Sequence, residues 1–261
     1  MYEEFSYIYD KLSFDLEYEK YANNIKKIAK DYKIGNDNML ELAAGSGMLT
    51  HYFFDDFKNV DALDISTDML NVFAEKYDND NVNLIYYDMV RYEKANTYDL
   101  IVILLDSVNY VTDPKELRML FDNCYRNLKE GGLLVFDINS EYKMNEVFGS
   151  NCYVYEYEDI FYTWDNFLED ELIDMHLNFF LENPDGSYKR IYEYQQERIY
   201  DRNYVKDLAR KSGLKDIKMY DEDDMGKVKE DTLRILYSAV KDSKWPRVQL
   251  SFLIAKKDMD L

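Results

Sequence analysis

Five short apolar runs, separated by segments with helical spacing, dominate the first 140 residues of the chain. They span residues 39–43, 60–64, 82–87, 100–105 and 133–137. Each run is too short for a typical helix, and residues 100–105 are continuously apolar, as a strand covered on both faces must be. Strands that alternate with helices predict a parallel, doubly wound sheet with right-handed crossovers.

Helix signals occupy the intervals between these runs. An amphipathic pattern predicts a helix over residues 16–32, and a second helix is expected over residues 48–57. Ser66 is placed to cap a third helix, and Asp113-Pro114-Lys115-Glu116 resembles a capping box with proline at the first helical position. Gly131-Gly132 would end that fourth helix.

The composition changes near residue 150. Residues 153–200 are rich in aromatic and β-branched side chains with polar positions between them, and Asn183-Pro184-Asp185-Gly186 is a turn signal. This pattern predicts antiparallel hairpins, so residues 151–200 are expected to form an inserted antiparallel sheet that covers the substrate site. Residues 1–150 and 201–261 would form the main domain. With further strands at 214–220 and 250–255, the prediction is an α/β, doubly wound, mostly parallel seven-stranded sheet of Rossmann-like type.

Charge and composition exclude several function classes. The chain has 52 acidic and 32 basic residues, a formal charge of −20, which disfavours nucleic acid and anionic membranes as partners. Two cysteines and two histidines provide neither a disulfide framework nor metal-ligand spacing, so no metal is expected. The first residues show no signal sequence and no apolar run is long enough to span a bilayer, which predicts a cytoplasmic protein.

The turn after the first predicted strand indicates an adenosine-containing ligand. Gly45-Ser46-Gly47 lets the backbone approach a ligand closely, and Asp64 lies at the end of the second strand, where an acid can accept hydrogen bonds from ribose hydroxyls. Thr50 replaces the third glycine of the dinucleotide fingerprint. Glu41 at the mouth of the turn would repel pyrophosphate, but it suits the ammonium and sulfonium charges of S-adenosylmethionine.

The pattern Glu41-x-Ala43-x-Gly45-x-Gly47, followed by Asp64, Asp88 and Leu104-Leu105-Asp106-Ser107, resembles the class I S-adenosylmethionine-dependent methyltransferases. Three further segments are similar to a bacterial small-molecule subgroup that carries an inserted antiparallel sheet. They begin at Tyr9-Asp10-Lys11-Leu12, Leu105-Asp106-Ser107-Val108-Asn109-Tyr110 and Phe136-Asp137-Ile138-Asn139-Ser140.

The resemblance implies a cofactor site for S-adenosyl-L-methionine, with S-adenosyl-L-homocysteine as product. Glu41 and the backbone of the glycine turn would hold the methionine part, Asp64 the ribose and Asp88 the adenine amino group. The implied cofactor residues are Tyr9, Glu41, Ala43, Gly45, Gly47, Asp64, Ile65, Met69, Asp88, Met89, Leu105 and Asp106. In the segment around Tyr9, either Tyr7 or Tyr9 could face the site.

The methyl acceptor is expected to be a small molecule bound beneath the inserted sheet, because ligands bind at the carboxyl ends of parallel strands. The substrate-binding candidates are Asn109, Tyr157, Tyr162, Trp164 and Arg198, although Arg198 could equally be an ion-pair partner on its own sheet. Asp106, Tyr110 and His176 are candidates for a general base. In-line transfer to nitrogen or oxygen needs alignment and exclusion of water, and only an alcohol or phenol would benefit clearly from a base.

Two alternatives remain open at this stage. An NAD-dependent oxidoreductase would use the same kind of turn, and a catalytically inactive protein could retain the S-adenosylmethionine pocket. The sequence is compatible with a monomer or a homodimer.

Overall fold

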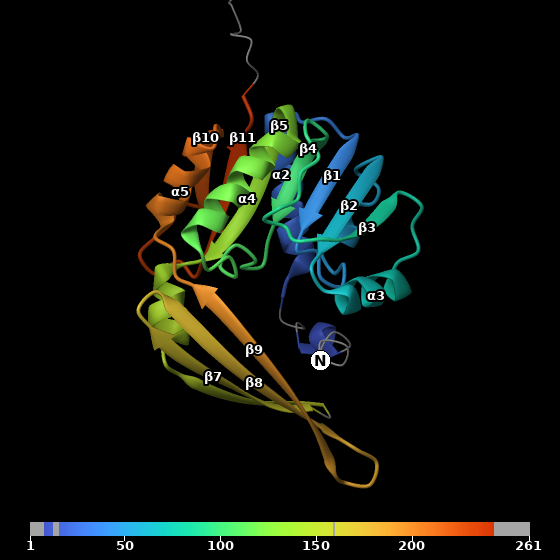
Figure 1. Cartoon of the computed structure of the whole chain (residues 1–261), viewed down its shortest axis with the longest axis vertical. Coiled ribbons are helices and arrows are strands. Elements are labelled where there is room, and N and C mark those ends of the chain that lie inside the picture. Colours follow the sequence, from blue (N-terminus) through green and yellow to red (C-terminus); the bar gives the residue numbers. More distant parts are fainter. Residues whose placement is uncertain (1–7, 13–15, 159, 243–261) are drawn as a thin grey trace, which may run out of the picture.

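The computed structural model describes residues 8–12, 16–158 and 160–242, and it contains two separate sheets (Figure 1). The larger sheet has seven strands in the order β10-β11-β5-β4-β1-β2-β3. Strands β1 to β5 run parallel, while β11 runs antiparallel to both β5 and β10. This arrangement confirms the predicted fold class. The strands are β1 (Asn38–Leu42), β2 (Asn59–Asp64), β3 (Val82–Tyr86), β4 (Tyr98–Ile103), β5 (Leu128–Asn139), β10 (Lys215–Asp221) and β11 (Arg234–Val240).

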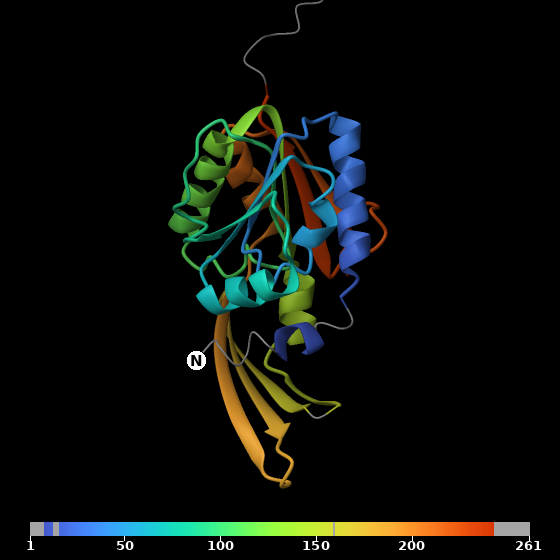
Figure 2. The ribbon, with the colours of Figure 1, turned by 90° about the vertical axis from the view of Figure 1, so that its right-hand side faces the viewer.

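Helices cover both faces of this sheet, as Figure 2 shows for α2 (Tyr18–Tyr32) and α4 (Pro114–Asn127). Side chains of β4 alternate between the two layers. Leu100 and Val102 belong to the core beneath α2, while Ile101 and Ile103 belong to the core beneath α4 and α5 (Arg202–Lys211). Burial on both faces explains why this strand is apolar at every position. None of the helices in the described ranges has the length and apolarity needed to cross a bilayer.

Two helix starts follow their predicted caps. The Ser66 hydroxyl accepts a hydrogen bond from the Met69 backbone N–H at 3.2 Å and begins α3 (Thr67–Lys76). The Asp113 carboxylate accepts from the Lys115 N–H at 2.8 Å and begins α4, with Pro114 in its first turn. Because these bonds satisfy otherwise unpaired N–H groups, they define where each helix starts.

Two predicted helix bounds are wrong. Helix α4 ends at Asn127 instead of at Gly131, and the chain continues directly as β5. The Asn127 side chain holds this end in place, because its oxygen accepts a hydrogen bond from the Lys94 N–H and its amide donates one to the Tyr92 carbonyl. Residues 48–57 form only a short 3₁₀ segment, η1 (Thr50–Phe53). Its β-branched and aromatic residues have low helix propensity, and burial of Phe53 against the α2 layer decides its conformation.

The seventh strand of the sheet is β11, which the sequence interpretation did not include. Its central residues Ile235–Ala239 are buried between β5 and β10. The predicted strand at 250–255 lies outside the described residues. The mainly apolar character of residues 235–240, interrupted only by Ser238, was an available signal for β11.

The second sheet extends from the carboxyl-terminal edge of the parallel strands (Figures 1 and 2). Its four antiparallel strands follow chain order and are β6 (Cys152–Tyr157), β7 (Ile160–Glu169), β8 (Leu172–Glu182) and β9 (Tyr188–Arg198). A π-helical segment, η2 (Lys143–Phe148), leads into it from β5. On β8 the buried residues Ile173, Met175, Leu177 and Phe179 share one face, where Ile8 of the helical residues 8–12 packs.

Asn109 connects the two sheets. Its side-chain oxygen accepts a hydrogen bond from the Asn139 N–H at 3.0 Å, and its amide donates to the Arg198 carbonyl at 2.9 Å. The Arg198 N–H returns a bond of 2.8 Å to the Asn109 carbonyl. Asn109 has no exposed surface, so these polar groups cannot be satisfied by bulk water if the side chain is lost.

We therefore expect Asn109→Ala to lower the free energy of unfolding by about 2–3 kcal/mol, because it leaves two buried backbone groups without partners. Urea denaturation followed by circular dichroism measures the change. Asn145→Ala is the control, since the Asn145 amide makes one exposed bond to the Glu141 carbonyl. An Asn109 variant no less stable than the control would contradict the connecting role.

Candidate active site

A cavity of about 1100 Å³ lies between the carboxyl ends of the parallel strands and the second sheet. Segments that are far apart in sequence contribute its walls, including the loops after β1 and β4, the second sheet and residues near the N-terminus. Most of the predicted site residues line this cavity, namely Tyr9, Glu41, Ala43, Gly45, Asp64, Ile65, Met69, Asp88, Met89, Leu105, Asp106, Tyr110, Tyr157, Tyr162 and Trp164.

Glu41 is a buried acid in the wall of this cavity. Its side chain lies at the end of β1 and is only 4% exposed. Its Oε2 atom has no hydrogen-bond partner in the described part of the chain. Burial raises the pKa of Glu41 to about 8. A positively charged ligand group would stabilise the ionised carboxylate, so this residue can hold a cation.

The loop after β1 requires left-handed backbone at two glycines. Gly45 has φ 55° and faces the cavity, whereas Gly47 has φ 80° and does not line it. A β-carbon at position 47 would lie 2.7 Å from the Phe73 ring. Gly47 therefore lets the loop pack closely against α3, and its predicted contact with a ligand gains no support from the geometry.

Asp64 joins the two loops that border the cavity. One carboxylate oxygen accepts a bond from the Gly45 N–H and the other from the Ser66 N–H, both at 2.8 Å. Burial raises the pKa of Asp64, while these backbone bonds oppose the rise. A carboxylate has about four acceptor positions, so capacity for ligand hydroxyls remains. The adjacent Ile65 side chain is 68% exposed and presents apolar surface at the rim.

Asp88 lies in the turn after β3, and its carboxylate already has partners within the protein. It accepts a bond from the Val90 N–H at 2.8 Å and forms an ion pair with Arg91. Arg91 also pairs with Glu116 at 2.7 Å. A ligand amino group at this position would share the carboxylate with Arg91.

The loop after β4 contains two consecutive non-glycine residues with left-handed backbone, Leu105 at φ 54° and Asp106 at φ 59°. The Asp137 carboxylate, at the end of β5, accepts bonds from both of their N–H groups at 3.0 and 2.7 Å. Arg234 from β11 bridges the two acids, at 2.8 Å from Asp106 and 3.3 Å from Asp137. These contacts hold a strained loop against the cavity floor.

The sequence interpretation missed several charged residues that line this cavity, namely Glu116, Lys143, Glu156, Glu193 and Arg234. Glu193 is 4% exposed and lies on β9, where the buried residues Ile191, Glu193 and Glu197 share one face. Acids at the inward positions of an alternating strand were a usable signal. The sequence signal that Arg234 belongs to the site was weaker, because it is only a single basic residue before an apolar run.

Three further predicted residues do not line the cavity. His176 lies on the face of β8 opposite the buried residues, where its Nδ1 is 2.6 Å from the Tyr192 hydroxyl. Arg198 pairs with Glu171 and donates to the Thr112 carbonyl, which fits the ion-pair alternative. Asn109 is enclosed by its contacts with Asn139 and Arg198.

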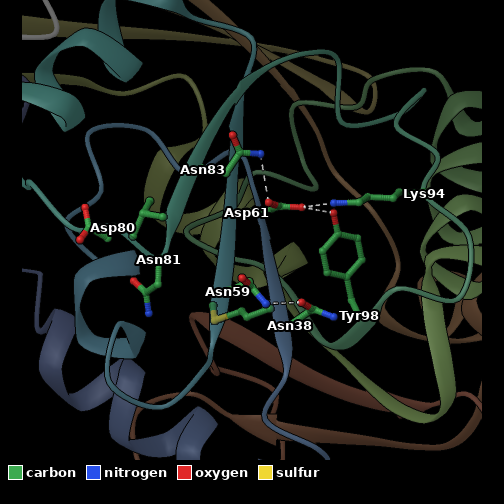
Figure 3. A pocket seen from close by; sticks show the side chains of 10 residues that line it. Asn38, Asn59, Asp61, Asp80, Asn81, Asn83, Lys94 and Tyr98 are labelled. Carbon is green, nitrogen blue, oxygen red and sulfur yellow. Dashed lines mark hydrogen bonds and ion pairs between the residues drawn. The ribbon is translucent and has the colours of Figure 1, made fainter.

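A second cavity of about 220 Å³ lies at the opposite, amino-terminal ends of the parallel strands (Figure 3). Its polar groups bind one another. Asp61 accepts hydrogen bonds from Asn83, Lys94 and Tyr98, and the Asn59 amide donates to Asn38 at 2.9 Å. Asp61 is therefore already neutralised by Lys94, in contrast to Glu41.

Comparison with known proteins identifies the family. A family described as a methyltransferase domain matches residues 39–132. A protein of Geobacillus sp. (strain WCH70), named provisionally as a methyltransferase, is 29% identical over 218 residues, which cover 82% of this chain and 88% of that protein.

The crystal structure of a S-adenosylmethionine-dependent methyltransferase from Clostridium acetobutylicum ATCC 824 superposes with a TM-score of 0.85 at 33% identity, over 93% of this chain and 99% of that one. The chain belongs to the S-adenosylmethionine-dependent methyltransferases. The sugar N-methyltransferase KedS8 from Streptoalloteichus sp ATCC 53650 shares the fold, with a TM-score of 0.77 at 16% identity, over 91% of this chain and 93% of that one. The family cofactor, S-adenosylmethionine, carries the cationic groups that the buried Glu41 carboxylate can accommodate.

We expect cofactor affinity to depend on the ionisation of Glu41. With a pKa of about 8, Glu41 is largely protonated in the free protein at acidic pH and ionises as the pH rises. The Kd for S-adenosylhomocysteine, whose amino group is cationic across this range, should fall at least about tenfold from about pH 5.5 to about pH 7.5. Isothermal titration calorimetry measures this change.

Glu41→Gln should bind weakly at every pH in this range and show a much smaller dependence. The same pKa shift predicts that the ligand-free protein loses stability as the pH rises from the ordinary carboxyl value toward 8, because the folded state retains the proton. A wild-type Kd that stays constant with pH would contradict the assignment.

Proposed function

We propose that this methyltransferase transfers the methyl group of S-adenosylmethionine to the nitrogen of a small organic amine. The observation that carries this proposal is the charge of the cavity wall. Among the described residues, the basic side chains of the wall are Arg234 and Lys143, and Arg234 is already paired with Asp106 and Asp137. The acidic residues of the wall are Glu41, Asp64, Asp88, Asp106, Glu116, Glu156 and Glu193. A cationic amine is attracted to such a cavity, whereas an anionic acceptor is repelled.

The cofactor half of the cavity is assigned to the loops of the parallel sheet. Glu41 would bind the cofactor's ammonium group, Asp64 the ribose hydroxyls and Asp88 the adenine amino group. Ile65 and Met89 line the cavity and would supply apolar surface for the adenine base. The remaining residues of this half are Tyr9, Ala43, Gly45, Met69 and Leu105. When bound, S-adenosylmethionine supplies a methyl group on a positively charged sulfur that leaves as a neutral thioether.

The acceptor half is assigned to the second sheet. Tyr157, Tyr162 and Trp164 line it from β6 and β7, and Glu193 faces it from β9. The Trp164 indole N–H has no hydrogen-bond partner within the described ranges, so it can donate to an acceptor molecule. Aromatic faces beside a carboxylate favour a cationic or flat ligand. The role of these residues is to align the acceptor nitrogen and to exclude water.

Two base candidates from the sequence are occupied in the structure. Asp106 is held by Arg234 at 2.8 Å, so it acts as an anion that fixes the floor. The Tyr110 hydroxyl already donates a hydrogen bond to the Gln195 side chain at 2.8 Å. Tyr110 is therefore suited to shaping the acceptor half of the cavity and poorly suited to accepting a proton. KedS8, which shares the fold and is by its name a sugar N-methyltransferase, supports the proposal of a nitrogen acceptor.

Matched pairs of amines and alcohols test the acceptor class. Benzylamine and tyramine should yield S-adenosylhomocysteine at rates at least about tenfold above benzyl alcohol and tyrosol, because the acidic wall favours the cation and the alcohols lack it. Liquid chromatography with mass spectrometry detects both the product cofactor and the methylated amine. Equal or faster turnover of the alcohols would refute nitrogen as the acceptor.

Replacing Asp64 tests the ribose assignment. Asp64→Ala should weaken S-adenosylhomocysteine binding about tenfold or more, since unpaired ribose hydroxyls cost about 1–3 kcal/mol. Asp64→Asn keeps one acceptor oxygen and should lose less. Calorimetry gives the Kd values, and thermal unfolding of the free variants separates loss of ligand contacts from loss of the loop bonds to Gly45 and Ser66. Unchanged affinity in the folded alanine variant would remove Asp64 from the cofactor site.

A further inference from the structure

Lys143 occupies an unusual position at the boundary between the two halves of the cavity. It is the first residue of η2, which follows the end of β5 after residues 140–142, and it lines the cavity wall. Its Nζ donates to the Asn139 side-chain oxygen at 2.9 Å and lies 4.9 Å from the centre of the Phe148 ring. Phe148 in turn packs on Trp164, with 5.0 Å between ring centres. The amine therefore lies beside the aromatic wall assigned to the acceptor.

The carboxylates around Lys143 are committed to other partners. Arg234 binds both Asp106 and Asp137, and the Asn139 amide donates to Glu197 at 3.1 Å. No ion pair to Lys143 is found among the residues that the structure describes. Its direct partner is instead the neutral oxygen of Asn139. The protein thus holds this amine in place without supplying the anion that would keep it protonated.

Burial, reinforced by the positive charge of Arg234, lowers the pKa of Lys143 to about 8. Asp106, Glu197 and Asp137 act in the opposite direction and do not cancel these effects. Near neutral pH a useful fraction of the side chain is therefore neutral, and efficient general bases have pKa values close to the working pH.

Lys94 provides the contrasting case within the same chain. In the small cavity of Figure 3 its Nζ lies 2.8 Å from Asp61, and this hydrogen bond raises the pKa of Lys94. Lys94 therefore stays protonated, as an ordinary ion-paired lysine does. The difference between the two lysines follows from their partners, a carboxylate for Lys94 and an amide oxygen for Lys143.

We propose that Lys143 is the general base that removes the proton from the acceptor's ammonium group before methyl transfer. This inference rests on the proposed function, because it requires a nitrogen acceptor. The proton passes from the acceptor nitrogen to the Nζ lone pair, so the acceptor becomes a neutral amine with a free electron pair and Lys143 becomes an ammonium ion. Charge and protons balance, and Lys143 returns the proton to solvent after the product leaves. Asn139 orients the Nζ atom for this transfer.

The pKa of Lys143 can be measured without any acceptor. In protein labelled with ¹³C at the lysine side chains, the Lys143 signal is assigned by its loss in Lys143→Arg and followed by NMR against pH. We expect Lys143 to titrate near pH 8, and Lys94 to titrate above its ordinary value. Titration of Lys143 at or above the ordinary lysine pKa of about 10.4 would overturn the proposal.

Kinetics test the proton transfer itself, with the benzylamine or tyramine reaction as probe. In the unmodified enzyme kcat should rise with pH and level off above the Lys143 pKa. Lys143→Met should lower kcat about 100-fold or more while the Kd for S-adenosylhomocysteine changes by less than about twofold. Lys143→Arg keeps a positive charge but cannot act as a base, so it should not restore kcat. Lys26→Met removes a surface ion pair with Asp56 and is the matched control.

The two proposals can fail separately. If no amine is methylated, the proposed function fails, and the NMR titration still decides whether Lys143 is a neutral amine at the working pH. If amines are methylated but Lys143→Met retains kcat and its pH dependence, the base assignment is wrong and the acceptor class stands.

Discussion

The structure of the active site depends on one buried carboxylate, Asp137. It has no exposed surface, yet it accepts hydrogen bonds from the backbone of Leu105 and Asp106 and contacts Arg234. Two successive left-handed residues are unfavourable unless their surroundings hold them, and Asp137 provides that restraint. Burial of an acid is itself unfavourable, and Arg234 together with the two N–H groups offsets it. The buried carboxylate of Asp137 therefore holds the loop that forms the floor of the cavity.

Two residues further along the same strand, Asn139 organises the other half of the cavity. Its backbone N–H binds Asn109, its amide binds Glu197 and its side-chain oxygen binds Lys143. Side chains separated by two positions lie on the same face of a strand, so Asp137 and Asn139 share one face at the carboxyl end of β5. One strand end thus holds the loop after β4, the end of the second sheet and the start of η2 in fixed relation.

The acids of the cavity wall differ in whether a basic side chain of the protein pairs with them. Asp106 and Asp88 have cationic partners within the protein, whereas the Glu41 Oε2 atom has no hydrogen-bond partner among the residues that the structure describes. The paired acids shape the wall, and the Glu41 oxygen is available to a ligand. A formal charge of −20 over the whole chain adds a general preference for cations, but the local pairing pattern determines where a cation would bind.

Local sequence signals were sufficient for the parallel strands, for the helix starts at Ser66 and Asp113, and for the position of Glu41 and Asp64 at strand ends. Each of these depends on residues within one turn or one strand, where periodicity and capping act directly. The same signals overestimated the helix after β1 and extended α4 as far as Gly131, because tertiary packing outweighs propensity at element ends.

Only the tertiary structure decided which charged residues meet. Arg234 is 97 positions from Asp137 along the chain, and antiparallel pairing of β11 with β5 brings them together. His176 and Arg198 are on the second sheet as expected, but the alternation of β8 turns His176 away from the cavity and Glu171 binds Arg198. Lys143 carries no motif at all, and its properties come from burial and from an amide partner. By itself, the sequence determined the fold class and the residues at the strand ends that border the predicted cofactor site. The acceptor half was decided by contacts between distant segments, which pattern and propensity do not encode.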